Sequence, residues 1–293
     1  MNAAPSRRAA PPPSPPFGGF SVLKASVLLA FALILASWFF ILVLDRQSQH
    51  SFFSMVTLDR GVNFLRQLTG AGVDRTPAYL DGQAWLDTGK LAFQTLAMSV
   101  LAIGIAVIGA LLTFMFGARN VMMGELSPYS GPVWKAWFFL VRAFFVITRA
   151  IPELVWAMLI VFVFTPGILP GALALGVHNL GILGKLASEI VEGLDSKPAH
   201  ALRATGAGRL KVLVYYVLPQ ALPRFMTYSF YRWEVIIRTT IIVGFVAAGG
   251  LGMEFRLAMS HFHYTTVTLL LIWYLILVVS VDLIASGMRR LAR

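Results

Sequence analysis

Long apolar runs alternate with shorter polar segments along the 293-residue chain. Six of these runs approach the ~20 residues that a helix needs to cross a bilayer. They cover residues 22–44, 91–117, 150–165, 168–190, 225–248 and 264–288. The third run is the shortest of the six. This pattern predicts an all-α membrane protein with six transmembrane helices.

Two further stretches are apolar on one helical face only. Residues 55–68 keep this spacing between the first two runs, which predicts a short amphipathic helix on the outer membrane surface. Trp134 to Phe145 keep it just before the third run. The second stretch is either an interfacial helix that leads into the third span or part of one tilted helix over residues 134–165.

The N-terminal residues 1–21 contain six prolines, Arg7 and Arg8 and no acidic residue, so we expect a disordered, proline-rich cytoplasmic tail. The run from Val22 to Leu44 is too long for the apolar core of a signal peptide, and no small-residue cleavage pattern follows it. We therefore expect it to remain as the first transmembrane helix.

Composition excludes a soluble protein, because 58% of the residues are hydrophobic and only 13% are charged. The net charge of +11 lies mainly on the tail, on residues 289–293 and on the loop after the fourth run. Residues 45–90, by contrast, balance basic and acidic side chains. The positive-inside rule therefore places both termini in the cytoplasm. The surplus charge follows membrane topology, so we expect no nucleic-acid partner.

These features suggest four regions. Residues 22–90 would hold the first span and an extracytoplasmic loop, and residues 91–288 the transmembrane core. Residues 289–293 would form a basic cytoplasmic tail after the disordered segment 1–21.

We find no pattern for catalysis or metal binding. The chain has no cysteine, no GxSxG turn and no closely spaced aspartate pair, and its five histidines lack metal-ligand spacing. Gly184-Lys185 lacks the flanking residues of a phosphate-binding loop. We therefore expect a non-catalytic chain that holds no metal or cofactor and does not bind ATP.

The loop at about residues 195–219 predicts a short, rigid helix. Ser196 can cap it, Pro198 suits its first turn and Gly206 suits its end. A second stretch from residue 209 should stop at Pro219 and again at Pro223. The first helix would expose Ala and Leu side chains beside Arg203, a surface that fits a groove in a soluble partner.

The spacing of Gly206, Tyr216 and Leu218-Pro219 resembles the loop signature of binding-protein-dependent ABC import permeases. The chain departs from that signature at His200, where the family has Glu, and at Leu202 and Tyr216. The missing carboxylate removes whatever contact that Glu makes to the ATPase. The resemblance implies that one set of residues couples to the ATPase. This set is Lys197, Pro198, His200, Ala201, Leu202, Arg203, Gly206 and Pro219.

Three further stretches resemble the permease subunit of phosphonate importers. They are residues 149–157, residues 201–207, and residues 231–238 together with 249–252. The likeness covers about residues 90–288. It implies a type I ABC importer permease core, a second copy of the chain, and an ABC ATPase dimer that binds ATP and magnesium. It also implies an extracytoplasmic substrate-binding protein.

The resemblance implies ATP-driven import of phosphonate, phosphate or phosphite by alternating access across the inner membrane. One alternative is a permease for another small ligand, such as methionine or a quaternary amine. A second is a membrane-embedded transferase, against which the absence of clustered catalytic acids or histidines counts.

Charged residues inside apolar helices are costly and usually have a partner or a pathway. Glu234 and Arg238 are four residues apart, as are Arg149 and Glu153, so each pair can meet on one helical face. Either both are internal ion pairs, or Arg149 and Arg238 lend positive potential to an anion path. Glu189, Glu192 and Asp282 have no evident partner in the sequence.

Gly249, Gly250 and Gly252 follow the fifth run at the expected outer face. Glycines permit a tight turn and close backbone approach there. The segment is either a gate hinge or a simple link to the next helix.

Overall fold

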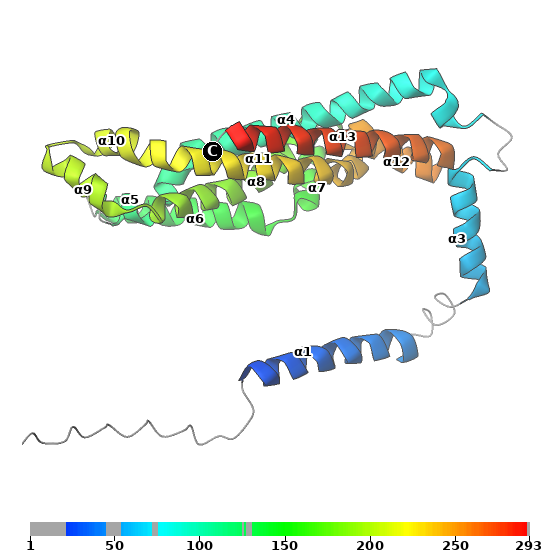
Figure 1. Ribbon diagram of the computed structural model, residues 1–293, viewed down its shortest axis with the longest axis horizontal. Helices are drawn as coiled ribbons and strands as arrows, with labels where there is room; N and C mark the ends of the chain where they lie inside the picture. Colours follow the sequence, from blue (N-terminus) through cyan, green and yellow to red (C-terminus); the bar gives the residue numbers. More distant parts are fainter. Residues whose placement is uncertain (1–21, 45–53, 72–75, 125, 127–130, 292–293) are drawn as a thin grey trace, which may run out of the picture. The chain divides into compact units, whose positions relative to one another are not determined.

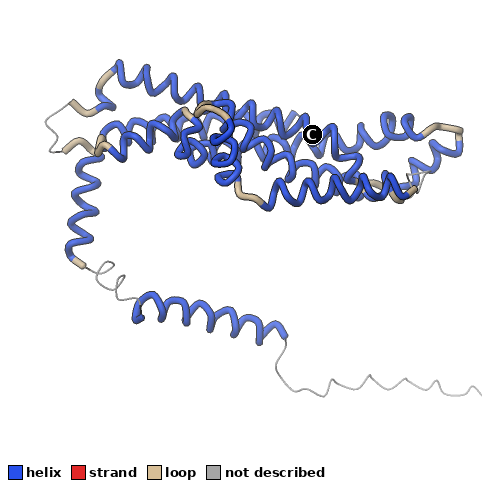
Figure 2. The backbone as a smooth tube through the Cα atoms, turned by 180° about the vertical axis from the view of Figure 1, so that it is seen from behind, coloured by secondary structure: helices blue, strands red, loops and turns tan. Residues whose placement is uncertain are grey.

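The computed structural model describes residues 22–44, 54–71, 76–124, 126 and 131–291. These residues form helices joined by short connections and contain no strand, which confirms the all-α prediction (Figure 2). The chain separates into two compact units, residues 1–65 and 66–293. The expected tail, residues 1–21, lies outside the described residues.

The first unit contains α1 (Val22–Phe39), which continues as the π-helical turn η1 (Phe40–Leu44). This segment is long and apolar enough to cross a membrane. The amphipathic helix predicted at residues 55–68 is present as α3 (Met55–Leu68), and its last three residues belong to the second unit.

The second unit is a bundle of long helices that lie side by side (Figure 1). Three of them are long and apolar enough to cross a membrane on their own. They are α4 (Gly82–Gly117), α8 (Ile168–Glu192) and α13 (Tyr264–Leu291). With α1 this gives four spans among the described residues, or up to six if each of two bent helix pairs is one span.

The helix α4 starts at Gly82 rather than at residue 91, so it extends beyond the predicted apolar run. It follows the one-turn 3-10 helix η2 (Ala78–Leu80). The side chain of Asp81 accepts a hydrogen bond from the backbone N–H of Gln83 and caps the helix. Polar first turns can continue a membrane helix into water, which a search for apolar runs does not detect.

The third predicted span is broken. α6 (Pro132–Ala150) and α7 (Glu153–Val163) meet at an angle of 94°. Pro152 has no N–H, and the residue before it is extended, as is usual before proline. α7 is about 16 Å long, roughly half the ~30 Å hydrocarbon thickness. Residues 150–165 therefore cannot cross alone, and the single helix over residues 134–165 was a wrong alternative.

The prolines at 219 and 223 do not stop the helix as predicted. α10 (Arg209–Val212), the π-helical turn η3 (Leu213–Val217) and α11 (Leu218–Val243) follow one another without a loop. Pro219 lies in the first turn after the wider π turn, and Pro223 is accommodated inside α11. The extra residue of a π turn absorbs the backbone mismatch that proline creates.

Small residues allow the central helices to approach closely, as in other membrane bundles. Ala102, Ala106 and Ala110 of α4 are fully buried. A Cβ atom added at Gly181 of α8 would lie 2.1 Å from the Thr148 hydroxyl, and one at Gly184 would lie 2.4 Å from the Phe145 ring. The glycines of α8 therefore set the distance between α8 and α6.

Candidate functional site

The predicted pair between Glu234 and Arg238 is wrong. Glu234 is buried on α11 and forms an ion pair with Arg289 of α13 instead. Arg238 is exposed and lies 3.5 Å from Asp282, also on α13. Side chains on a neighbouring helix reach these groups better than side chains one turn away on the same helix.

The predicted pair between Arg149 and Glu153 is also wrong, because the chain bends between them. Glu153 begins α7, and its Oε2 lies 3.4 Å from Nε2 of His178 on α8. Arg149 is exposed at the end of α6 and makes no ion pair within the described part of the chain. The break at Ile151 and Pro152 therefore sends the two side chains to different surroundings.

The structure reveals a polar cluster that the sequence reasoning missed. His178 and Asn179 are adjacent in the middle of α8, and Arg232 lies in the middle of α11. Nε and Nη2 of Arg232 donate to Oδ1 of Asn179 at 2.9 and 2.5 Å. With Glu153 these residues form what we name the midspan cluster.

The midspan cluster is connected to the helix break. Nδ1 of His178 lies 2.9 Å from the carbonyl oxygen of Ile151, one of the two residues between α6 and α7. The sequence places Arg232 inside the fifth apolar run, although its charge was counted with the loop after the fourth run, and His178 had no assigned role. A His-Asn pair inside an apolar run was the available signal, since polar groups within membrane helices usually have a partner.

The short helix predicted at residues 196–206 is present as α9 (Ser196–Ala204), at one end of the second unit (Figure 1). The side chain of Asp195, rather than Ser196, caps it by accepting from the N–H of Lys197 at 3.0 Å. Gly206 has a φ of +83° and ends the helix, as predicted.

One face of α9 is exposed and the other packs on the bundle. The exposed face carries Lys197, Pro198, His200 and Ala201. Leu202 is partly buried against the core, so it does not project outward as predicted. Arg203 turns inward as well and donates to the carbonyl oxygen of Leu126.

Arginine side chains connect the helices at the end of the bundle where α9 lies. Arg209 donates to the carbonyl oxygen of Val121 at 3.0 Å, and its guanidinium lies 5.0 Å from the Trp134 ring centre. Arg142 of α6 forms an ion pair with Glu192 at the end of α8. Glu192, which had no evident partner in the sequence, also accepts from the backbone N–H of Arg119 in α5 (Arg119–Met122) at 2.6 Å.

The glycine segment forms a tightly packed bend near the other end of the unit. The π-helical turn η4 (Gly244–Ala248) leads through Gly249 to α12 (Gly250–Ser260), and φ is +80° at Gly249 and +66° at Gly250. A Cβ atom at Gly252 would lie 2.3 Å from the carbonyl oxygen of Ile241. Gly252 is therefore required for close packing, and Gly249 and Gly250 provide the positive φ angles of the bend.

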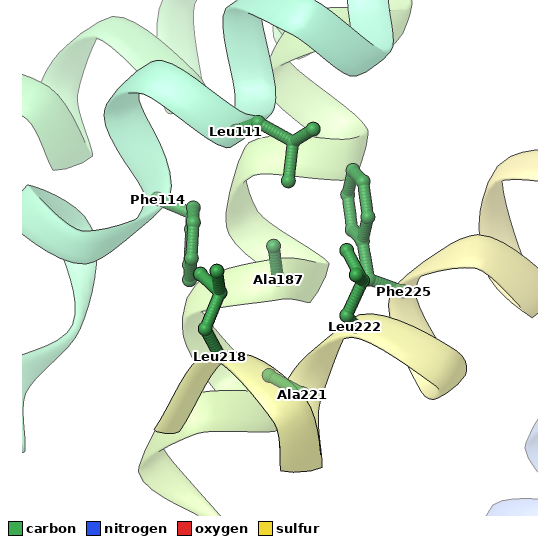
Figure 3. Close-up of a pocket in the computed structure, with 7 residues that line it drawn as sticks. All are labelled: Leu111, Phe114, Ala187, Leu218, Ala221, Leu222 and Phe225. Atoms are coloured by element: carbon green, nitrogen blue, oxygen red, sulfur yellow. The ribbon is translucent and has the colours of Figure 1, made fainter. Parts of the chain in front are cut away.

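A small apolar pocket lies between α4, α8 and α11 (Figure 3). Its lining residues are Leu111, Phe114, Ala187, Leu218, Ala221, Leu222 and Phe225. It has room for no more than about one water molecule and offers no polar side chain to hold one. It is a packing defect beside the π turn rather than a ligand site.

The described residues contain no group of three or more His, Cys, Asp or Glu side chains that could hold a metal ion. The candidate functional features among these residues are the midspan cluster and the exposed face of α9. The first offers charge and hydrogen bonds within the bundle, and the second offers a surface at its end.

Residues 133–292 match the family described as the binding-protein-dependent transport system inner membrane component. The chain belongs to this family. It is therefore a multi-pass component of the inner membrane, as predicted, and the matched region runs from α6 through α13. Both the short helix α9 and the midspan cluster lie within this region.

Two relatives are informative. The chain is 31% identical to the phosphite transport system permease protein of Stutzerimonas stutzeri, over 90% of this chain and 87% of that protein. It is 33% identical to the phosphate-import permease protein of Mycolicibacterium smegmatis, over 73% of this chain and 38% of that protein. This chain is therefore a transport permease subunit.

The fold also matches a solved transporter. The inward-facing MetNI methionine ABC transporter aligns with a TM-score of 0.57 and 18% identity, over 73% of this chain and 99% of that one. At this identity the likeness establishes the shared helical architecture alone.

Proposed function

We propose that the chain is the permease subunit of an ATP-driven importer for phosphite, phosphate or a phosphonate. The observation that carries this proposal is the similarity to permeases named for phosphite and phosphate, which extends over most of the chain. The midspan cluster supports it, because an oxyanion that crosses hydrocarbon needs compensating positive charge. The chain itself catalyses nothing in this proposal.

The permease works with three kinds of partner in this scheme. A second copy of the chain completes the path, an ABC ATPase dimer binds ATP and magnesium, and an extracytoplasmic binding protein delivers the ligand. The family description names binding-protein dependence directly. Lys197, Pro198, His200 and Ala201 form the exposed surface that the ATPase would contact.

Movement of the ATPase reaches the membrane through contacts on both sides of α9. Arg203 donates to Leu126 and Arg209 to Val121, and the Tyr216 hydroxyl donates to the carbonyl oxygen of Asp195. Leu202 adds an apolar contact to the core. A push on α9 would therefore shift α4, α8 and α11 together and favour one of two access states.

The remaining predicted residues act at the two ends of α11. Pro219 follows the π turn and starts the helix, and the bend at Gly249, Gly250 and Gly252 follows its other end. In this scheme the bend is where α12 changes its angle when access alternates. Its positive φ angles let the chain turn where other residues would be strained.

Uptake by the reconstituted complex tests the proposal. The chain is placed in proteoliposomes with its own ATPase and binding protein, and uptake of labelled phosphite, phosphate and methylphosphonate is measured with ATP or with a non-hydrolysable analogue. We expect ATP-dependent uptake of at least one of these oxyanions. Uptake of methionine in their place would contradict the proposed substrate class but retain the permease function.

A further inference from the structure

Arg232 is the arginine of the midspan cluster, and most of its hydrogen-bond donors are not used within it. A guanidinium has five N–H donors, and the hydrogen bonds to Asn179 use two of them. The other donors have no hydrogen-bond partner among the described residues, and Arg232 forms no ion pair there. Charged donors within a bundle are costly to leave unmatched.

The neighbouring groups hold Arg232 without neutralising it through a direct contact. Asn179 is uncharged, and its amide nitrogen donates to the carbonyl oxygen of Leu175 at 2.7 Å, which fixes its orientation. Glu153 is close enough to interact electrostatically with Arg232, yet its direct contact is to His178. The guanidinium is therefore oriented on one side and retains donors on the other.

The position of this group fits a place where a ligand passes. Arg232 and Asn179 lie near the middle of α11 and α8, both of span length, next to the 94° break between α6 and α7. Irregular backbone at membrane depth is tolerated where it is buried in protein or lines a cavity. Transporter binding sites characteristically lie near the bilayer midplane at broken helices.

We propose that Arg232, oriented by Asn179, forms a transient binding site for the oxyanion halfway along the path. This inference rests on the proposed function and adds the residues that contact the ligand. The planar guanidinium matches two oxygens of a tetrahedral phosphorus oxyanion. The nearby carboxylate of Glu153 limits the affinity, so the ligand can leave as well as enter.

The replacement Asn179→Asp provides the sharpest test because it is isosteric. It keeps an acceptor oxygen for Arg232 and supplies a fixed negative charge that competes with the ligand. Arg232→Gln removes the charge directly. Arg224→Gln is the matched control, since Arg224 lies on the same helix, is exposed and is outside the cluster.

Each variant is assayed in the reconstituted complex at an oxyanion concentration below saturation, with ATP hydrolysis in the absence of ligand measured alongside. We expect Asn179→Asp and Arg232→Gln to lower uptake at least about tenfold, the value of a charge-assisted hydrogen bond. Uptake and basal ATP hydrolysis by Arg224→Gln should both stay near wild type.

If uptake by Asn179→Asp stays within about twofold of uptake by the wild-type complex, the proposed site is overturned and the proposed function is left intact. The same holds if Arg224→Gln loses as much uptake as Arg232→Gln, because the effect would then be general charge loss. Failure of the wild-type complex to take up any phosphorus oxyanion would instead overturn the proposed function, and with it the ligand assigned to Arg232.

Discussion

The ion pair between Glu234 and Arg289 offers a quantitative test of how the bundle is held together. The Glu234 side chain is 8% exposed and the Arg289 side chain is 24% exposed. Replacement of Arg289 by Met keeps an unbranched apolar stem but removes the guanidinium and leaves a buried carboxylate without its partner. We expect a loss of about 3–5 kcal/mol in the free energy of unfolding, the usual cost of breaking a buried pair.

Replacement of the other partner, Glu234, should lower the free energy of unfolding by less. In Glu234→Gln the orphaned group is Arg289, which lies two residues before the last residue of α13 and is more exposed than Glu234. The amide of Gln can still accept a hydrogen bond from the guanidinium. We expect a loss of about 1–3 kcal/mol. The order of the two effects follows from the greater exposure of Arg289 and from the hydrogen bond that the Gln amide can still accept.

Asp282→Asn provides the control on the same pair of helices. The pair between Arg238 and Asp282 is 3.5 Å long, and both side chains are 54% exposed. Exposed pairs contribute about 0–1 kcal/mol, so this variant should resemble wild type. Thermal unfolding of the purified protein in detergent, followed by tryptophan fluorescence at one scan rate, gives the comparison. Equal unfolding midpoints for Arg289→Met and Asp282→Asn would refute the reasoning.

Two further predictions concern the bend and the short helix α9. Gly252→Val places a side chain against the carbonyl oxygen of Ile241 and should lower the free energy of unfolding by about 1–3 kcal/mol. Gly208→Ala is the control, because its new Cβ atom meets nothing within 4 Å and should not lower stability. Equal thermal unfolding midpoints for the two variants would contradict the close packing at Gly252. Ala201→Glu adds a charge to the exposed face of α9 and should lower ATP-driven uptake without moving the unfolding midpoint, and unchanged uptake would argue against an ATPase contact there.

Much of the fold could be predicted from the sequence because its signals are local. Apolar run length predicts the four helices that are long enough to span on their own, and helical periodicity predicts α3 at residues 55–68. Capping residues place α9 to within one residue at its start, and Gly206 predicts its end. The family resemblance from residues 149–157 and 231–238 agrees with the family match.

The site was less predictable, because pairing depends on which helices face one another. Arg238 is one turn from Glu234, yet Glu234 pairs with a residue on α13. Arg232 follows the basic loop residues in sequence, but the helix continues through Pro219 and Pro223 and carries it into the bundle. The direction of the break at Pro152 decides that Glu153 meets His178 rather than Arg149.

The sequence therefore determined the helical class, four of the six predicted membrane-spanning segments and the short helix between the fourth and fifth apolar runs. Those features depend on hydrophobicity, caps and turns within a few residues. Only the tertiary structure decided the ion-pair partners, the 94° turn of α7 and the meeting of Asn179 with Arg232. Such contacts depend on the rotation and tilt of whole helices, which packing between small residues sets and no local pattern encodes.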